Sequence, residues 1–301
     1  MKKSSVGISI AIIAVLVVII GGAVYHTQKN NRFVHSTTAT LFFHGGGSSY
    51  HAETGMVNAA KKAGVTNTVI RADVTNNGKV TLHGNMYRGA VNPIVEVNYE
   101  NNRQLDFNKH GEYATNVVKM LKKRYGINKI NMVGHSLGNI SIIYYMLRNG
   151  QNKNMPRLEK QVDIAGHFGG LTFNGIPDAL KQPAGMKLDS NGKPNYMNTT
   201  YKQMTAARKA YPKGQVAVLN IYGDIGNHTD GRVTNASSRS LQYLVASRAK
   251  SYTELKVTGK NAQHSKLHDN KQVDQALIKF LWQRRNLIKH HKTNLLSRVK
   301  A

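Results

Sequence analysis

The residues best suited to covalent chemistry lie in the segment Gly134-His135-Ser136-Leu137-Gly138, which has the form G-x-S-x-G. A serine between two such glycines is typical of a nucleophile elbow, a strained turn that exposes the hydroxyl group between a strand and a helix. The flanking sequence has that order, because INMVG has the pattern of a strand and NISIIYYML that of a helix. We therefore predict that Ser136 is a catalytic nucleophile.

A serine hydroxyl group is a weak nucleophile and needs a general base. Where this elbow is used, an acid and then a histidine follow the serine along the chain. His264 and His268 both follow the last predicted strand, and the position of His264 makes it the preferred base. Asp224 and Asp230 both follow the strand VAVLNIYG. Asp230 lies further into the loop and is the preferred acid, with Asp224 as the alternative.

Acyl transfer also needs two main-chain N–H groups that stabilise the developing oxyanion. Leu137, the residue after the nucleophile, is predicted to supply one of them. The segment His44-Gly45-Gly46-Gly47 follows the first core strand and has the form of an HGGG-type oxyanion loop, in which Gly46 is the predicted second donor. The 13 histidines show no H-E-x-x-H or similar ligand spacing, so no metal is predicted.

These residues must be positioned by strands that alternate with helices along the chain. Strands are predicted at 39–43, 67–74, 93–99, 127–134, 159–166, 215–224 and 251–259, with a hairpin-like piece at 78–87. Helices are predicted at 54–64, 104–126, 136–150, 235–250 and 271–285, with Asn235 as an N-cap. The alternation predicts an α/β fold with a mostly parallel central sheet and helices on both faces.

One polar segment interrupts this alternation. Residues 170–212 are rich in Gly, Pro and Asn and are too long for an ordinary connection, so we predict a small cap insertion, with a mobile surface loop as the alternative. Gly166–Gly175 is expected to line the site. The predicted organisation is a linker at 26–38, a catalytic domain at 39–290 and a basic tail at 291–301.

The N-terminal sequence predicts an export signal. Lys2 and Lys3 precede an uncharged apolar run from Val6 to Val24, whose length is between that of a signal-peptide core and that of a spanning helix. We predict an uncleaved signal anchor, a transmembrane helix within residues 1–25, with the rest of the chain on the extracellular face of the cell membrane. Cleavage near Gly21–Ala23 would instead give a secreted protein.

The chain is strongly basic, with 42 Lys and Arg against 15 acidic residues and a formal net charge of +27. Export argues against nucleic acid as a partner and favours anionic cell-wall polymers, although the charge could serve solubility alone. The chain has no cysteine, which excludes disulfides and a lipid-modified cysteine anchor. Export without cysteine is typical of a Gram-positive surface protein.

Together, LFFHGGG, INMVGHSLGN, DIAGHFGG, NIYGDIGNHTDGRV and GKNAQHSKLHDN resemble the α/β-hydrolase superfamily, and within it the uncharacterised cell-surface hydrolases of low-GC Gram-positive bacteria. In similar lipases the acid lies in a D-x-x-V loop and the base in an H-x-x-L loop, and Asp230 and His264 match those positions. The resemblance implies an α/β-hydrolase fold and cofactor-free hydrolysis of carboxylic esters through Ser136, His264 and Asp230. The alternatives are a cell-envelope acyltransferase and a non-catalytic protein that binds anionic wall polymers.

Overall fold

The computed structural model describes residues 32–284 of the chain, which fall into two units. Ser36–Leu281 contains the sheet and all the candidate site residues. In the other unit, Phe33 and Gln283 form an antiparallel bridge. The predicted anchor (1–25) and basic tail (291–301) lie outside the described residues. Within 32–284 there is no helix with the length and apolar character needed to cross a bilayer.

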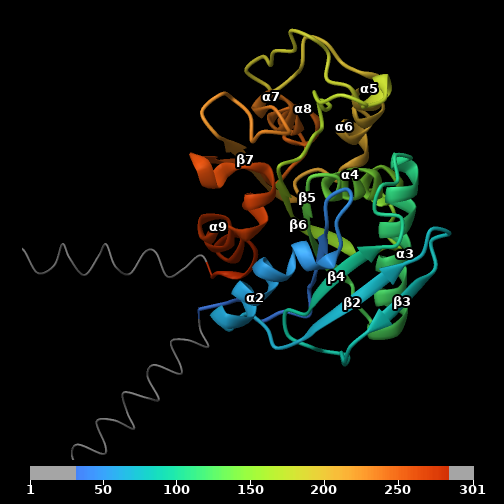
Figure 1. Cartoon of the computed structure of the whole chain (residues 1–301). Helices are drawn as coiled ribbons and strands as arrows, with labels where there is room; N and C mark the ends of the chain where they lie inside the picture. Colours follow the sequence, from blue (N-terminus) through green and yellow to red (C-terminus); the bar gives the residue numbers. More distant parts are fainter. Residues whose placement is uncertain (1–31, 285–301) are drawn as a thin grey trace, which may run out of the picture. The chain divides into compact units, whose positions relative to one another are not determined.

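The sheet has eight strands in the order β3-β2-β4-β1-β5-β6-β7-β8 (Figure 1). Their bounds are β1 Ala39–Phe43, β2 Val69–Val74, β3 Val80–His83, β4 Ile94–Tyr99, β5 Lys129–His135, β6 Arg157–Ile164, β7 Ala217–Asp224 and β8 Ser251–Thr258. All neighbouring pairs are parallel except β2 and β3, so the predicted mostly parallel sheet is confirmed. Because the other strands run the same way, their carboxyl ends share one edge, where ligands bind in open α/β sheets.

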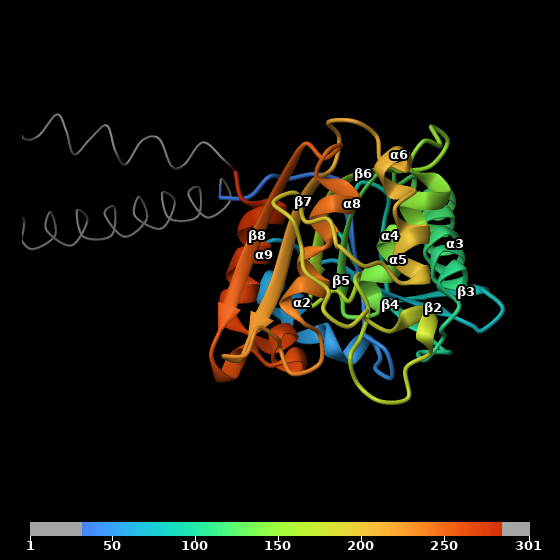
Figure 2. The same ribbon diagram turned by 90° about the horizontal axis from the view of Figure 1, so that it is seen from above.

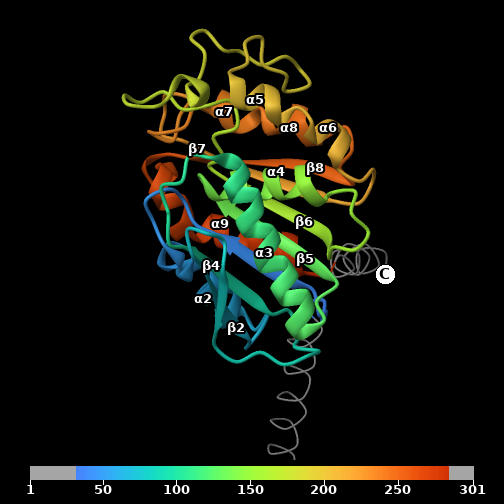
Figure 3. The same cartoon turned by 90° about the vertical axis from the view of Figure 1, so that its right-hand side faces the viewer.

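Helices cover both faces of this sheet. The α-helices are α2 Thr54–Ala63, α3 Phe107–Tyr125, α4 Gly138–Asn149, α5 Thr199–Met204, α6 Ala207–Ala210, α7 Asn235–Arg239, α8 Leu241–Val245 and α9 Lys271–Trp282. In Figures 2 and 3, α3 and α4 lie against one face, and α2 and α9 lie against the other. Two covered faces explain why β1 is apolar throughout and buried at all five positions.

The central strands are held by packing on both sides. Leu41 and Phe43 of β1 belong to the apolar cluster that includes α3 and α4. Phe42 between them is equally buried but points to the opposite face, as alternation along a strand requires. On the first face α3 and α4 approach closely, because a Cβ at Gly111 would lie 2.8 Å from the Tyr144 carbonyl oxygen. This rigid centre supports the ends of β1 and β5.

The segment predicted as a cap connects β6 to β7. It contains the 3-10 turn η2 Asp178–Leu180 and the short helices α5 and α6. Isolated bridges join Leu171 to Lys181 and Leu188 to Pro194. Two hydrogen bonds tie the segment to the region before and within α7, from Thr234 Oγ1 to Gln182 Oε1 at 2.6 Å and from Ser237 Oγ to the Gly170 carbonyl oxygen at 2.7 Å. These contacts give the insertion an internal structure of its own.

The predicted helix at 235–250 differs from the structure, which has two short helices, α7 and α8, that meet at Ser240. The Tyr201 hydroxyl group donates to the Ser240 carbonyl oxygen at 2.8 Å, so a tertiary contact uses an acceptor that a continuous helix would need. The N-cap of α7 is Thr234 rather than the predicted Asn235, and its side chain accepts from the Ser237 N–H group. The prediction of helical structure was therefore correct, but the prediction of one continuous helix was wrong.

Candidate active site

Ser136 lies in the sharp turn between β5 and α4. Its φ angle is +52°, in the left-handed region, which costs a residue other than glycine about 1–3 kcal/mol. Its N–H group donates to the Ile164 carbonyl oxygen at 2.9 Å, which ties the turn to the end of β6. A Cβ at Gly134 would lie 2.7 Å from the Asn139 nitrogen, and one at Gly138 only 2.1 Å from the Phe43 carbonyl oxygen. Both glycines are needed because main chain passes that close.

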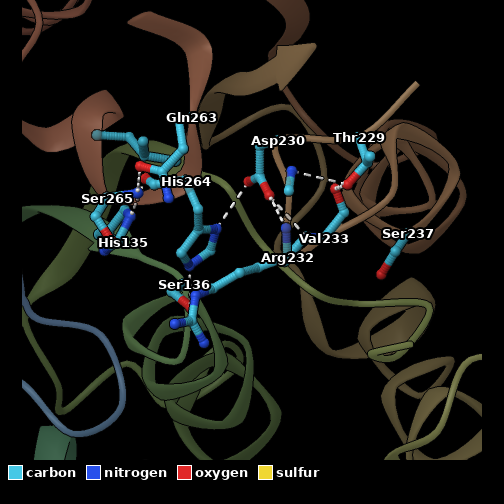
Figure 4. A network of polar contacts seen from close by, with 12 residues as sticks. His135, Ser136, Thr229, Asp230, Arg232, Val233, Ser237, Gln263, His264 and Ser265 are labelled. Atoms are coloured by element: carbon cyan, nitrogen blue, oxygen red, sulfur yellow. Dashed lines mark hydrogen bonds and ion pairs between the residues drawn. The ribbon is translucent and has the colours of Figure 1, made fainter. Parts of the chain in front are cut away.

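His264 lies between Ser136 and Asp230 in a line of hydrogen bonds (Figure 4). It begins the 3-10 segment η4, His264–Asp269, which follows β8 and the turn η3, Lys260–Ala262. Its Nδ1 is 2.7 Å from Asp230 Oδ2, and its Nε2 is 3.0 Å from Ser136 Oγ. An ionised carboxylate only accepts, so Nδ1 carries the proton when the imidazole is neutral. Nε2 is then free to accept the proton of the serine hydroxyl group.

Asp230 is held from the other side by its own turn. Its Oδ1 accepts hydrogen bonds from the N–H groups of Arg232 at 2.9 Å and Val233 at 2.7 Å. Its main-chain carbonyl oxygen accepts from the N–H group of His264 at 2.8 Å. Asp230 is only 1% exposed, so these N–H donors take the place of water around its carboxyl group. The turn therefore fixes both the acid and the main chain of the histidine.

Asp224, the alternative acid, has different partners. Its Oδ2 forms an ion pair with Lys256 Nζ at 2.7 Å and accepts from Asn235 Nδ2 at 3.0 Å. The hydrogen bond from Lys256 and those from the N–H groups of Gly226 and His228 hold the pKa of Asp224 well below its usual value. The structure thus brings Asp230 to His264 and uses Asp224 to join the loop after β7 to β8.

His268, the alternative base, packs against His135 rather than Ser136. The two rings meet edge to face with centroids 4.9 Å apart, and burial lowers the pKa of His268. His135 also lies 4.9 Å from the His264 ring, and its Nε2–H group donates to the His264 carbonyl oxygen at 3.1 Å. Burial, followed by the nearby His264 and His268, lowers the pKa of His135 well below its usual value. His135 is thus neutral at neutral pH. Its hydrogen bond to His264 was not predicted from the sequence.

The predicted oxyanion donors lie side by side. A Cβ at Gly46 would lie 3.2 Å from Leu137 Cδ2, so the glycine loop passes directly over the residue that follows Ser136. Within the described part of the chain, neither the Gly46 N–H group nor that of Leu137 has a hydrogen-bond acceptor. Two adjacent main-chain donors without acceptors are the arrangement that a developing oxyanion requires.

His44, the first residue of the glycine loop, holds that loop in place. Its Nε2 accepts the Tyr99 N–H group at 3.0 Å, so its Nδ1 carries the proton and donates to the Gly45 carbonyl oxygen at 2.8 Å. Burial lowers the pKa of His44, which favours this neutral form. With its carbonyl oxygen bound to the ring, the peptide after Gly45 is fixed in orientation. The His-Gly-Gly pattern located this histidine, but the sequence did not reveal its partner Tyr99.

No group of three or more His, Cys, Asp or Glu side chains in residues 32–284 is arranged to hold a metal ion. The titratable side chains around Ser136 instead bond to one another and to main chain. What the arrangement can do chemically is transfer a proton from Ser136 to His264 beside a pair of free N–H groups.

Fold and site define the chain as an α/β hydrolase. The family model described as "Alpha/beta hydrolase of unknown function (DUF915)" matches residues 27–284, and the chain belongs to this family. No curated protein sequence matches it.

Two solved structures have the same fold. The product of gene lin2722 from Listeria innocua is 24% identical, with a TM-score of 0.71 over 82% of this chain and 94% of that one. A protein from Lactobacillus plantarum described as a cell surface hydrolase is 20% identical, with a TM-score of 0.65 over 81% and 91%. The resemblance inferred from the sequence motifs is thereby confirmed.

Proposed function

We propose that this α/β hydrolase cleaves carboxylic esters through an acyl-enzyme on Ser136. The observation that carries the proposal is the continuous line of hydrogen bonds from Asp230 through His264 to Ser136 Oγ. Each neighbour in that line has the donor or acceptor that proton transfer requires. The strained φ angle of Ser136 keeps the hydroxyl group at the end of the line.

In the proposed reaction, Ser136 Oγ attacks the acyl carbon while His264 Nε2 takes its proton. The N–H groups of Gly46 and Leu137 bind the oxyanion, and Asp230 stabilises the imidazolium that forms. His264 then gives the proton to the leaving alcohol, and the acyl group remains on the serine. Water, deprotonated by His264, attacks the acyl-enzyme and releases the acid and the free serine.

The test is labelling by a fluorophosphonate probe together with hydrolysis of short 4-nitrophenyl esters. We expect the wild-type chain to label and to turn over, and Ser136→Ala to lose both. Ser265→Ala is the matched control, because Ser265 is an exposed serine beside His264 and should keep both activities. Equal labelling of Ser136→Ala and wild type would contradict the proposal. Added glycerol separates hydrolysis from acyl transfer, since a transferase would form the glyceryl ester in place of the free acid.

We further propose that the enzyme acts on the extracellular face of the membrane. The proposal is supported by Lys2 and Lys3 before the apolar run from Val6 to Val24 and by the description of the Lactobacillus relative. Protease added to intact cells should degrade the enzyme, and fractionation should recover it with membranes. A protease-resistant enzyme in the soluble cell extract would contradict this localisation. Binding to anionic cell-wall polymers remains a prediction from the net charge of the protein.

A further inference from the structure

Two arginines come from loops that form the candidate site. Arg103 lies in the turn after β4, and this turn is joined to the glycine loop by two hydrogen bonds. The Gly47 N–H group donates to the Asn102 carbonyl oxygen at 2.8 Å, and Asn102 Nδ2 donates to the Ser48 carbonyl oxygen at 2.7 Å. The Arg103 guanidinium lies against Gly47, because its Nη2 is 3.1 Å from the position that a Cβ at Gly47 would take. Arg103 therefore lies beside Gly47, one residue after Gly46, the predicted oxyanion donor.

Arg232 comes from the loop that holds the acid. Its N–H group donates to Asp230 Oδ1 at 2.9 Å, so its main chain is fixed by the proposed triad. In Figure 4 its side chain extends from this loop toward Ser136. The guanidinium carbon lies over the Phe173 ring, 6.0 Å from the centroid. Phe173 belongs to Gly166–Gly175, the segment predicted to line the site, and a guanidinium in a cation–π contact can still donate its N–H groups to a ligand.

Both guanidinium groups lack an acidic partner. Three other arginines do have such a partner, Arg71 with Asp73 at 2.9 Å, Arg239 with Glu254 at 2.9 Å, and Arg157 with Glu159. Within residues 32–284, no carboxylate forms an ion pair with Arg103 or Arg232, and both side chains are exposed. Two unneutralised cations, one beside each half of the catalytic machinery, favour a negatively charged ligand. The planar guanidinium can bind a carboxylate or a phosphate through two parallel hydrogen bonds.

We propose that the site prefers esters that carry an anionic group, a carboxylate or a phosphate, close to the ester bond. This inference rests on the proposed esterase function and names its substrate class. Arg103 and Arg232 bind the anion and thereby hold the ester carbonyl against Ser136. The net charge of +27 attracts anions to the whole surface, but a uniform attraction acts on any anionic ester. Only cations at a fixed place in the site convert the attraction into positioning of the ester.

The test compares matched esters with the full chain. The first pair places the charge on the acyl group: mono-(4-nitrophenyl) glutarate against 4-nitrophenyl valerate. The second pair places it on the alcohol: acetylglycerol phosphate against glycerol monoacetate. The quantity measured is the ratio of kcat/KM for the anionic ester to that for the neutral ester. We expect a ratio of about 10 or more in at least one pair at low ionic strength, falling as salt is added.

Substitution assigns the preference to the two arginines. In the double variant Arg103→Met, Arg232→Met, the ratio should fall several-fold, toward the smaller value that the general charge of the protein gives, and each single variant should lie between. Arg148→Met is the matched control, because Arg148 is an exposed arginine in the last turn of α4, about 15 Å along the helix from the elbow. It removes one charge and should leave the activity and the ratio at their wild-type values.

Two outcomes would overturn the inference. One is a wild-type ratio below about 2 in both pairs, with neutral esters cleaved. The other is a high ratio that the double variant retains, which would assign the preference to the general charge of the protein. Absence of both fluorophosphonate labelling and turnover of any ester would be a different result. It would contradict the esterase proposal itself.

Discussion

The imidazole of His135 donates a hydrogen bond to the main-chain carbonyl oxygen of His264, with 3.1 Å between Nε2 and the oxygen. The residue before Ser136 thus holds the main chain of His264, the residue proposed to accept the serine proton. The two histidines are 129 positions apart in the sequence, so this bond joins the elbow directly to the loop after β8. It helps to fix the distance between the proposed nucleophile and the proposed base independently of the Ser136–His264 hydrogen bond.

Replacement of His135 should therefore slow catalysis by displacing His264. His135→Phe removes the donor and leaves a buried carbonyl oxygen unpaired, which costs about 1–3 kcal/mol of unfolding free energy. We expect kcat to fall by about ten-fold or more with little change in KM, because the effect is on the geometry of proton transfer. His135→Gln, which keeps an N–H donor, should recover part of kcat. Equal kcat values for the two variants would show that the hydrogen bond does not position the base.

The two candidate acids can be separated by amide substitutions of the same size. Asp230→Asn should lower kcat by about three to four orders of magnitude, because an amide favours the wrong tautomer of His264. Asp224→Asn should leave kcat within a few-fold of wild type and lower the unfolding free energy, since it breaks the ion pair with Lys256. The measurements are kcat on a 4-nitrophenyl ester and urea denaturation. A larger loss of kcat in Asp224→Asn would reverse the assignment.

Much of this architecture follows from local sequence patterns. The strands around Ser136 are short apolar runs bounded by glycine, and such runs predict buried parallel strands without knowledge of their neighbours. The G-x-S-x-G pattern of the elbow is local in the sequence, and Gly134 contacts the nearby Asn139, although Gly138 contacts Phe43 of the distant strand β1. Asp230 and His264 follow strands whose carboxyl ends share one edge, so chain order favoured them over Asp224 and His268, and their match to the D-x-x-V and H-x-x-L loops of similar lipases strengthened the choice.

The features that sequence did not predict depend on contacts between distant residues. The helix at 235–250 is interrupted because Tyr201 donates to Ser240, and helical periodicity carries no information about that donor. His44 was recognised in its motif, but its orientation depends on the N–H group of Tyr99. Arg103 reaches the glycine loop only because Asn102 bonds to it. In each case a contact between residues far apart in the sequence decides the outcome.

Glu53 makes stability depend on pH. Its carboxyl group is buried at the start of α2, and neither oxygen has a hydrogen-bond partner among the described residues. Burial, with a smaller contribution from the nearby Glu96, raises the pKa of Glu53 to about 8. The folded protein then keeps a proton that the unfolded chain releases above about pH 4.5. This linkage lowers stability as pH rises from about 4.5 to 8, by roughly 1.4 kcal/mol per pH unit.

Glu53→Gln should remove this dependence. We expect the variant to gain stability over wild type as pH increases, with a difference of about 3–4 kcal/mol between the values at pH 5 and pH 8. Urea denaturation at the two pH values measures it. Glu100→Gln is the control, because Glu100 is exposed and its substitution should change the unfolding free energy by the same amount at pH 5 and at pH 8. An equal difference in unfolding free energy between Glu53→Gln and wild type at the two pH values would show that Glu53 is ionised in the folded protein.

Gly138 should tolerate no side chain, because an alanine Cβ there would lie 2.1 Å from the Phe43 carbonyl oxygen. Both groups belong to main chain that is held by the sheet and by α4, so neither can move without displacing β1 or the elbow. We expect Gly138→Ala to lower the unfolding free energy by about 3 kcal/mol or more and to abolish fluorophosphonate labelling.

The matched substitution is Gly55→Ala in α2. Its nearest contact would be the His268 carbonyl oxygen at 3.5 Å, which is ordinary van der Waals contact. An alanine at this helical position should be neutral or stabilise by up to about 1 kcal/mol. Urea denaturation of both variants measures the difference. Gly138→Ala with wild-type stability and labelling would show that the chain can widen the turn, and close approach to β1 would then not explain the glycine.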